Sequence, residues 1–321
     1  MPAAARATSY DFMPTLTVAF CTYRRADRLD RLLAALRAQD CPTDFEILAV
    51  NNASPDDTLD VLARLQALPG APLRVVTEPA PGIVPARNRA LSEARDRDIL
   101  VFIDDDELPE PGFLRTAHDA IMREGAHCVG GRIEIDFSVH ARPVWLDDEI
   151  AGFLGRLDHG TTPRWIESDQ TPVWSGNTVY AMAFFRAHPE LRFDARYNRE
   201  GADVGGGEDA AMLRALLGLG ARIRYRPDMA VLHAVDAWKL SRGYFVKLHY
   251  RAGLRQGQFR LPDFPRTVLG IPPFLIAQFV RHGLKTLGLL PAGRAALVRQ
   301  AMNAANALGV IVGYRRRGVR T

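Results

Sequence analysis

The chain has 321 residues, of which 47% are hydrophobic and 24% are charged, and its formal net charge is +4. This composition is typical of a globular protein with one large or two modest domains, rather than of a disordered chain. Its three cysteines are far apart, odd in number and without CxxC spacing, so they suggest neither a disulfide framework nor a zinc knuckle, and they fit a reducing compartment.

Strand and helix patterns alternate over the first 135 residues. Short apolar runs predict strands at 15–23, 45–50, 73–77, 98–104 and 128–135. Apolar residues at helical spacing predict helices at 25–39, 54–68, 84–96 and 108–124. This alternation predicts a mostly parallel sheet covered by helices. Ligands of such sheets bind beyond the carboxyl ends of the strands, where Thr22, Asn51 and residues 104–106 would collect.

The pattern changes in the middle of the chain. Residues 136–205 are irregular and rich in Trp, Gly and Pro, with one strand candidate at 171–185, and long irregular stretches of this kind are often binding loops. A second ordered unit at 205–235 begins with a glycine turn and continues as a helix, with Gly220 as its C-cap, and a strand.

Four consecutive carboxylates follow one of the predicted strands. The five apolar residues Ile99–Ile103 run directly into Asp104, Asp105, Asp106 and Glu107. Like charges at the end of a buried strand repel one another unless a positive group lies among them. A divalent cation, Mg²⁺ or Mn²⁺, is the simplest such group, because hard carboxylate oxygens bind these ions together with a substrate's phosphates. The alternative is an acidic turn that caps a helix beginning near Pro109.

Five segments follow one another along the chain: "VAFCTYRRADRLDRLLAAL", "EILAVNNASPDDT", "PGIVPARNRALSEARDRDILVFIDDDELP", "WSGNTVYA" and "GGGEDAAMLRALLGLGARIRY". Over about residues 14–235 the chain closely resembles the family 2 glycosyltransferases of the GT-A fold. The resemblance implies a Rossmann-like mixed sheet flanked by helices, with residues 1–235 as the catalytic domain. It also implies the inverting transfer of a sugar from a nucleotide-diphosphate sugar, with a UDP-sugar as first choice. The QxxRW motif of processive members is not found, so one sugar per encounter is expected.

The resemblance assigns the donor's base and ribose to Thr22, Tyr23 and Arg24 and to Asn51. Family members usually carry Asp in place of Asn51, and an amide brings donors and no charge. The choice between uridine, thymidine and guanosine nucleotides therefore stays open. Arg87 resembles the family arginine that approaches the nucleotide or its diphosphate, and the alternative is a solvated arginine on a helix.

The carboxylate run matches the family's DxD motif. The resemblance places Asp104 near the ribose, Asp105 in the donor site and Asp106 on the metal, with Asp104 and His233 as further candidate metal ligands. A structural histidine at a strand end is the alternative for His233. The expected cofactor is Mn²⁺ or Mg²⁺.

A sugar hydroxyl is a poor nucleophile at neutral pH, so the reaction needs a base. The "GGGED" segment supplies Glu208 and Asp209 at the start of a helix, and the resemblance makes Asp209 the base. Favourable placement of both acids at a helix N-terminus is the alternative.

The "WSGNTVY" segment falls where the family shapes its sugar and acceptor pocket. Trp174 is expected to stack on a sugar, while Gly176 and Asn177 are expected to line the pocket. A tryptophan in the hydrophobic core is the alternative for Trp174.

The end of the chain is basic. From Asp236 onward there are fifteen Lys and Arg, against the acids Asp236 and Asp263, interleaved with apolar stretches. Such a pattern suits an anionic membrane better than nucleic acid. Residues 236–321 are therefore expected to form a helical, amphipathic region that lies in the membrane interface, since Pro272, Pro273 and Arg281 interrupt the span that crossing a bilayer needs. The alternative is a helical pair that packs on the catalytic domain or dimerises.

The N-terminus lacks the apolar core of a signal peptide. Together these features predict a cytoplasmic enzyme, peripheral on the inner face of the cytoplasmic membrane, whose acceptor is a saccharide or a lipid-linked saccharide of cell-surface glycan synthesis. Three alternatives are weighed: a sugar-phosphate nucleotidyltransferase, an aspartyl phosphatase and a catalytically inactive membrane scaffold. The first should carry a glycine-rich signature after the first strand, where this chain has "CTYRRADR". The second should carry DxDx[TV], where Glu107 and Leu108 follow here.

Overall fold

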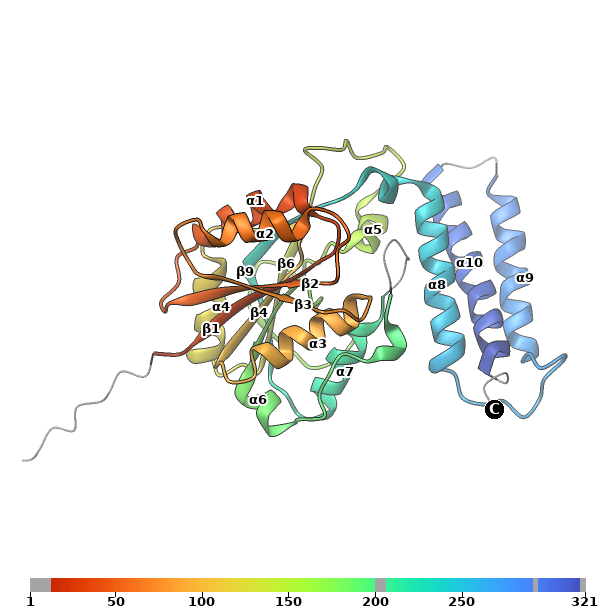
Figure 1. Ribbon diagram of the computed structural model, residues 1–321. Coiled ribbons are helices and arrows are strands. Elements are labelled where there is room, and N and C mark those ends of the chain that lie inside the picture. The colour runs from red at the N-terminus through yellow and green to blue at the C-terminus, as the bar shows by residue number, and fades with distance from the viewer. Residues whose placement is uncertain (1–12, 200–205, 291–293, 318–321) are drawn as a thin grey trace, which may run out of the picture.

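The computed structural model describes residues 13–199, 206–290 and 294–317. Two parts lie side by side: an α/β unit built on one sheet, and a bundle of three long helices (Figure 1). The carboxyl ends of the first strands point toward the bundle (Figure 1).

The sheet has the strand order β3-β2-β1-β4-β8-β6-β9-β5, with β7 paired to β9. Its strands are β1 (Leu16–Thr22), β2 (Phe45–Asn51), β3 (Leu73–Thr77), β4 (Ile99–Ile103), β5 (Glu107–Pro109), β6 (Cys128–Asp136), β7 (Arg164–Ile166), β8 (Asn177–Ala181) and β9 (Ile223–Ala234). The first four strands are parallel, and the register of β1 on β2 ends with Thr22 opposite Asn51. Strand β8 is antiparallel to both of its neighbours, so the sheet is mixed.

Helices cover this sheet because their apolar residues share one side. In α1, for example, Leu29, Leu32, Leu33 and Leu36 are all buried. Helices α1 and α2 lie on one face of the sheet and α3 on the other (Figure 1). The helical elements of the α/β unit are α1 (Ala26–Arg37), α2 (Thr58–Gln66), α3 (Ile83–Glu93), α4 (Phe113–Met122), α5 (Asp148–Ala151), η1 (Gly152–Leu154), α6 (Met182–Ala187), η2 (Ala195–Tyr197) and α7 (Glu208–Gly218).

The strands predicted before residue 136 are all present, and the helix predicted at 108–124 begins later than expected. Helix α4 begins at Phe113, and Glu107–Pro109 instead form β5, which pairs with the end of β9. The alternative interpretation, an acidic turn that caps a helix beginning near Pro109, is therefore wrong. The carboxylates form the link between two strands of the sheet.

The bundle consists of α8 (Arg242–Phe259), α9 (Pro273–Gly288) and α10 (Arg294–Arg317). Helix α10 lies between the other two (Figure 1). Glycines at the α8–α10 contact bring the backbones very close: a Cβ on Gly257 would be 2.2 Å from the Val310 carbonyl oxygen, and one on Gly313 would be 2.0 Å from that of Leu254.

Helix α10 has one side that packs against the rest of the protein. Its apolar side chains Val298, Met302, Val310 and Tyr314 are buried inside the protein. One side of α10 therefore packs against protein, as the alternative to membrane contact predicted, whereas α9 exposes Phe274, Val280, Leu284 and Leu287.

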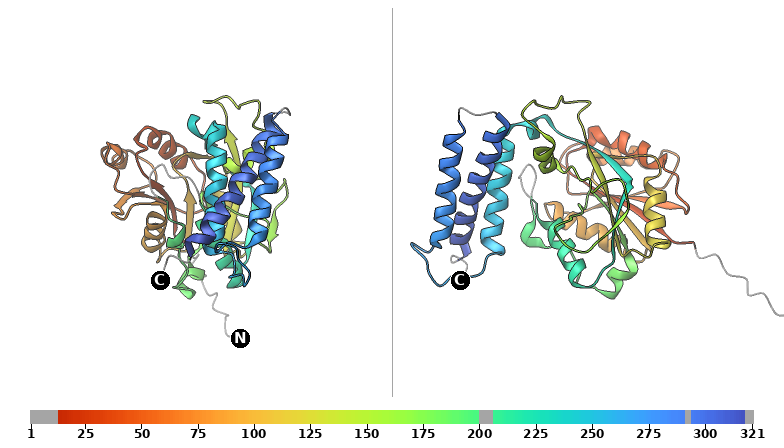
Figure 2. Two further views of the ribbon diagram at one scale, coloured as in Figure 1. Left: turned by 90° about the vertical axis from the view of Figure 1, so that its right-hand side faces the viewer. Right: turned by 180° about the vertical axis from the view of Figure 1, so that it is seen from behind.

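The bundle also packs on the α/β unit. A second hydrophobic cluster joins Ile150 and Leu154 to Phe245 of α8 and to Val298 and Met302 of α10. Arg299 of α10 adds an ion pair with Asp147 at 3.2 Å. The short helix η3 (Ala237–Leu240) connects β9 to α8, and the view from behind shows the three helices side by side, next to the α/β unit (Figure 2). Within the described ranges, the helices are too short or too polar to cross a membrane.

Candidate active site

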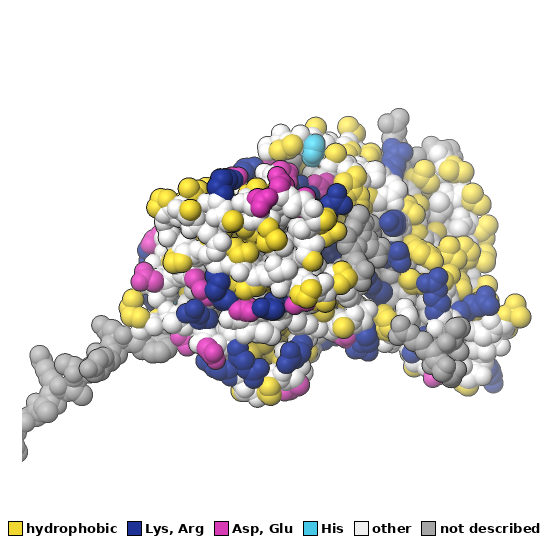
Figure 3. Space-filling view, in the orientation of Figure 1, with side chains coloured by type: hydrophobic (Ala, Val, Ile, Leu, Met, Phe, Trp, Pro, Cys, Tyr) yellow, Lys and Arg dark blue, Asp and Glu magenta, His cyan; other side chains and the backbone are white. Residues whose placement is uncertain are grey.

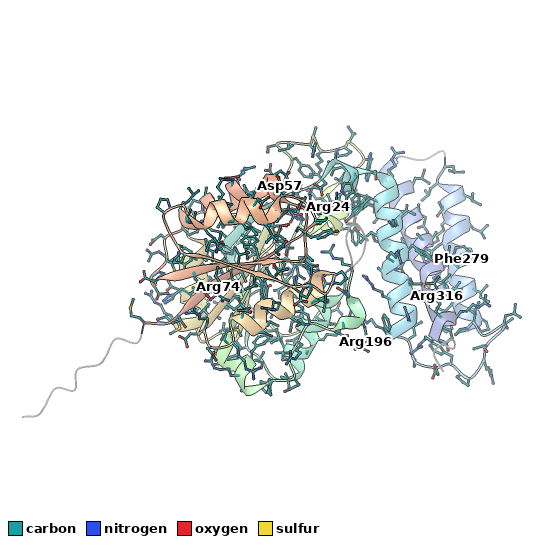
Figure 4. The ribbon with its side chains drawn as sticks, viewed as in Figure 1. Arg24, Asp57, Arg74, Arg196, Phe279 and Arg316 are labelled. Atoms are coloured by element: carbon teal, nitrogen blue, oxygen red, sulfur yellow. The ribbon has the colours of Figure 1, made fainter. Side chains whose placement is uncertain are left out.

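A cleft of about 910 Å³ opens at the carboxyl ends of β1 and β4. Six of the predicted donor-site residues line it: Thr22, Tyr23, Arg24, Asp104, Asp105 and Asp106. The opposite wall comes from η3 and α8, through Trp238, Lys239, Tyr244 and Leu248. Arg24 lies on the side of the α/β unit that faces the bundle (Figure 4). The cleft is therefore formed by both parts of the molecule.

The loops after β1 and β2 adopt an unusual backbone conformation. Arg24 and Ala53 have positive φ angles of 56° and 51°, which non-glycine residues rarely adopt and which cluster at functional sites. Ser54 Oγ accepts a hydrogen bond from the Arg24 backbone N–H at 3.1 Å and so ties the two loops together.

Asn51 lies beneath the cleft rather than in its lining. It is fully buried, and its Oδ1 accepts a hydrogen bond from the Ser54 backbone N–H at 3.2 Å. Asn51 Nδ2 and Thr22 Oγ1 are buried and have no hydrogen-bond partner among the described residues. Buried polar atoms are usually paired, so the ends of β1 and β2 hold two unused polar atoms near the cleft.

Asp106 is surrounded by groups that carry, or can carry, positive charge. Its Oδ2 lies 3.5 Å from Lys239 Nζ, 3.5 Å from His233 Nε2 and 3.9 Å from an Arg28 guanidinium nitrogen. Arg28 and Arg25 also pair with Asp236, the Arg25 contact being 3.0 Å. In this structure the protein's own cations lie among the aspartates.

A divalent cation also fits this place. No group of three His, Cys, Asp or Glu side chains arranged to hold a metal occurs in the part of the chain that the structure describes. Mg²⁺ and related ions, however, are commonly bound by one or two carboxylates together with a substrate's phosphates. Asp106 Oδ2 and His233 Nε2 are close enough to share one ion, and His233 Nε2 is buried without a hydrogen-bond partner.

Arg87 joins the two acidic motifs. From α3 its guanidinium contacts Asp104 at 3.0 Å, Glu208 at 3.1 Å and Asp209 at 2.9 Å. The side chain is buried, so it is not a solvated helix arginine. It holds carboxylates together rather than lining the cleft itself.

The two acids of the ED motif differ in exposure. The Glu208 side chain is 2% exposed and that of Asp209 is 21% exposed, so only Asp209 is open to a substrate. Asp209 Oδ1 also accepts a hydrogen bond from the Ser175 hydroxyl. Two donors therefore fix the orientation of the Asp209 carboxylate.

Burial and neighbouring charges shift the pKa values of the carboxylates in different directions. Burial, together with the adjacent Asp106, raises the pKa of Asp105 to about 7. Burial opposes ionisation of Asp106 as well, but His233 and Lys239 outweigh it and lower the pKa of Asp106. Burial and Asp209 raise the pKa of Glu208. Strongly shifted pKa values of neighbouring groups are frequent at active sites.

The predicted sugar-pocket residues lie outside the cleft lining. Trp174 is partly buried against the core. Asn177 is fully buried, and its Nδ2 donates to the carbonyl oxygens of Arg132 and Met229, both at 2.9 Å. A Cβ on Gly176 would lie 2.7 Å from Asp104 Oδ2, so the glycine makes room for the carboxylates.

Sequence reasoning missed several residues of the site: Arg25, Arg28, Ser175, Asp236 and Lys239. The only signal for the first two was the basic "RRADR" after the first strand. Ser175 lies inside a quoted motif, but Asp236 and Lys239 come from the region that was assigned to membrane contact.

The fold and site together define a class, the GT-A sugar-transferring enzymes. The sequence profile described as Glycosyl transferase family 2 matches residues 17–188, more than half of the chain, and the chain belongs to that family.

Curated relatives match over part of their length. The chain is 25% identical over 126 residues to "Glycosyltransferase AglE" of Haloferax volcanii, covering 39% of this chain and 41% of the relative. It is 32% identical over 118 residues to "Succinoglycan biosynthesis protein ExoW" of Rhizobium meliloti, covering 36% of this chain and 37% of the relative. The matched region thus spans less than half of each relative.

Solved structures match over nearly the whole chain. A mannosyltransferase from Pyrobaculum calidifontis, in complex with GDP-Man and Mn²⁺, superposes with a TM-score of 0.60 at 19% identity, covering 94% of this chain and 88% of the other. Residues 1–349 of S. aureus TarS, in complex with UDP, superpose with a TM-score of 0.53 at 18% identity, covering 95% and 92%. These likenesses confirm the GT-A fold.

Proposed function

We propose that the protein transfers one sugar from a nucleotide-diphosphate sugar to a hydroxyl group of a saccharide acceptor, by a single displacement that inverts the anomeric centre. The observation that carries the proposal is the bridge formed by Arg87. One guanidinium contacts Asp104, which lines the cleft, and Asp209, the exposed acid of the ED motif. A donor held at the aspartates and an acceptor at Asp209 would therefore be neighbours.

The donor side is formed by the ends of β1, β2 and β4. Thr22, Tyr23, Arg24 and Asp104 line the cleft, and the buried Asn51 supports the loop after β2 by accepting a hydrogen bond from the Ser54 backbone N–H. Two solved relatives in fold bind GDP-Man and UDP. We therefore assign a nucleoside-diphosphate sugar, with UDP-sugars as first choice and GDP-sugars as second.

Asp106 and His233 would hold a Mn²⁺ or Mg²⁺ ion. When bound, this ion offsets the negative charge that develops on the departing diphosphate.

Asp209 accepts the acceptor's hydroxyl proton while that oxygen attacks the anomeric carbon. The bond from this carbon to the diphosphate oxygen breaks at the same time, and the nucleoside diphosphate leaves. Ser175 and Arg87 both contact Asp209 Oδ1 and so orient the base. Glu208, whose pKa is raised by burial and by Asp209, pairs with Arg87 instead.

We further propose that the acceptor is a saccharide or lipid-linked saccharide of cell-surface glycan synthesis, and that the enzyme works on the inner face of the cytoplasmic membrane. Support comes from α9, whose side chains Phe274, Val280, Leu284 and Leu287 are at least half exposed. Hydrophobic side chains gather over the part of the bundle farthest from the sheet, bordered by Lys and Arg (Figure 3). Asp263 is the only acidic residue after Asp236.

The test is the variant Asp209→Asn, assayed for nucleoside-diphosphate release from UDP- and GDP-sugars with saccharide acceptors. We expect a loss of at least about 10²-fold in rate, the usual contribution of a general base, with unchanged binding of the nucleoside diphosphate. The product of the wild-type protein should have the inverted anomeric configuration by NMR, and EDTA should abolish its formation until Mn²⁺ is added back.

A matched control is Asp96→Asn, which changes an exposed aspartate away from the cleft and should keep full activity. Retention of more than about a tenth of the wild-type rate by Asp209→Asn would exclude Asp209 as the base. Absence of donor turnover with every nucleotide-sugar would favour the inactive scaffold. No observation favours the nucleotidyltransferase over the family assignment.

A further inference from the structure

Lys239 occupies a position that the catalytic motifs do not explain. It belongs to η3, outside the region matched by the family profile, yet its ammonium group lines the cleft and pairs with Asp106 at 3.5 Å. Its side chain is 18% exposed and that of Asp106 is 12% exposed, so the pair is largely shielded from water. The Lys239 ammonium group therefore pairs with the same carboxylate that a bound metal ion would need.

The two arginines near Asp106 are held mainly by Asp236, although Arg28 also lies 3.9 Å from Asp106. Arg25 pairs with Asp236 at 3.0 Å, and Arg28 pairs with the other oxygen of the same carboxylate. Asp106 is the ion-pair partner that the structure gives for Lys239. Lysine is also a compact charge on a flexible four-carbon stem, whereas arginine is a rigid planar fork. Lys239 is therefore the cation best able to change partner.

We propose that Lys239 and the divalent cation exchange places on Asp106, and that the displaced ammonium group then binds the diphosphate of the donor. The inference rests on the proposed metal-dependent use of a nucleotide-diphosphate sugar. A divalent ion beside Lys239 is repelled by the ammonium charge, and an anionic diphosphate relieves that repulsion by giving Lys239 a new partner. Metal and donor therefore bind cooperatively, because neither is well accommodated without the other.

Cooperativity of this kind is reciprocal. If the nucleotide strengthens metal binding by some factor, the metal strengthens nucleotide binding by the same factor, usually roughly 5- to 150-fold. Removing the Lys239 charge should change the affinity for Mn²⁺ alone and the affinity for the nucleotide in the presence of Mn²⁺ in opposite directions. Mn²⁺ alone should bind more tightly, since its competitor for Asp106 is gone. The nucleoside diphosphate should bind more weakly in the presence of Mn²⁺, since one phosphate contact is lost.

The experiment measures Mn²⁺ binding by electron paramagnetic resonance, and UDP and GDP binding by calorimetry with and without Mn²⁺, on the full chain. For Lys239→Met we expect tighter binding of Mn²⁺ alone and a coupling factor reduced by at least about fivefold. Lys239→Arg keeps the charge and should keep part of the coupling. Lys247→Met removes an exposed lysine of α8 that does not line the cleft, so both affinities should stay at the wild-type values.

Unchanged Mn²⁺ affinity and unchanged coupling in Lys239→Met would overturn the exchange while leaving metal-dependent transfer intact. Weaker Mn²⁺ binding in this variant would also overturn it, because Lys239 would then assist the metal site. If wild-type protein binds neither Mn²⁺ nor either nucleotide, the proposed function and this inference both fail. Circular dichroism and thermal unfolding establish that each variant is folded.

Discussion

Arg87 is the residue on which the acidic groups of the site converge. Its side chain is 3% exposed, and it faces three carboxylates from two different parts of the chain. These carboxylates raise the pKa of Arg87 well above its usual value, although burial alone would lower it. The ring of Phe193, 5.6 Å from the guanidinium carbon, covers one side of the group. Arg87 therefore stabilises the fold as well as positioning Asp209.

Replacement of Arg87 by Met should destabilise the protein. The change removes the ion-pair partner of the buried Glu208, which lies beside the Asp209 carboxylate, and breaking a buried pair in this way typically costs about 3–5 kcal/mol. Urea unfolding monitored by circular dichroism measures the effect. The double variant Arg87→Met/Glu208→Gln should recover part of the loss, because the most buried acid is then neutral. A change below about 1 kcal/mol, the level of an exposed pair, would contradict this role.

The sequence predicted the acidic motifs because each is local: a carboxylate run directly after an apolar strand, and an acid pair directly after glycines. It did not predict the contacts among them. Arg87 and Glu208 are 121 residues apart, and only the tertiary fold brings the first residue of α7 to the Arg87 guanidinium. Lys239 could not be predicted for the same reason, since its partner lies 133 residues earlier.

Among the elements, those with strong periodicity were predictable. The strands β1 to β4 are continuous apolar runs, and α1 places its leucines on one face. Strand β5 was missed because Glu107–Pro109 is too short for a pattern and its proline reads as the start of a helix. Only its pairing with β9 makes it a strand. The packing of α10 was also hidden, since glycines at the α8–α10 contact show no hydrophobic signal.

The contact between α8 and α10 gives a prediction at this scale. Gly257→Ala places a methyl group 2.2 Å from the Val310 carbonyl oxygen and 2.7 Å from the Tyr314 backbone nitrogen. Backbone atoms cannot rotate away, so the helices must separate, and overpacking of this kind typically costs about 1–3 kcal/mol. Thermal unfolding should show a lower melting temperature.

Gly283→Ala is the matched control for this glycine. Gly283 also lies within a long helix, α9, but no neighbouring atom lies within 4 Å of the place where its Cβ would be. Alanine is favoured over glycine inside helices by roughly 0.5–1 kcal/mol, so this variant should melt at a higher temperature. Equal shifts for the two variants would show that close backbone packing is not what Gly257 provides.

At the scale of the whole molecule, the exposed side of α9 predicts binding to anionic lipid. Leu284 and Leu287 are 64% and 63% exposed, and Arg281 and Lys285 lie on the same helix. Each cation near an anionic leaflet contributes about 1 kcal/mol. The full chain should float with phosphatidylglycerol-rich vesicles at low salt, and Leu284→Glu/Leu287→Glu should abolish flotation, because it replaces apolar contact with repulsion.

The control for this prediction is Leu59→Glu, which places a charge at an exposed leucine of α2 in the α/β unit. It should float like the wild-type protein. Flotation of the α9 double variant at the wild-type level, or no flotation of the wild-type chain, would remove the membrane role. The exposed leucines would then need another partner.

The uneven charge of the chain has a consequence for how the molecule would turn near an anionic surface. The α/β unit is acidic overall, whereas the bundle carries most of the basic residues after Asp236, so the protein is an electric dipole. Charges act over a Debye length of about 8 Å at physiological salt. Within that distance of an anionic surface, such a dipole experiences a torque that turns the bundle toward the surface before any contact forms. The cleft shares a wall with that bundle. Rotation in solution would therefore bring the site of chemistry close to the surface before docking begins.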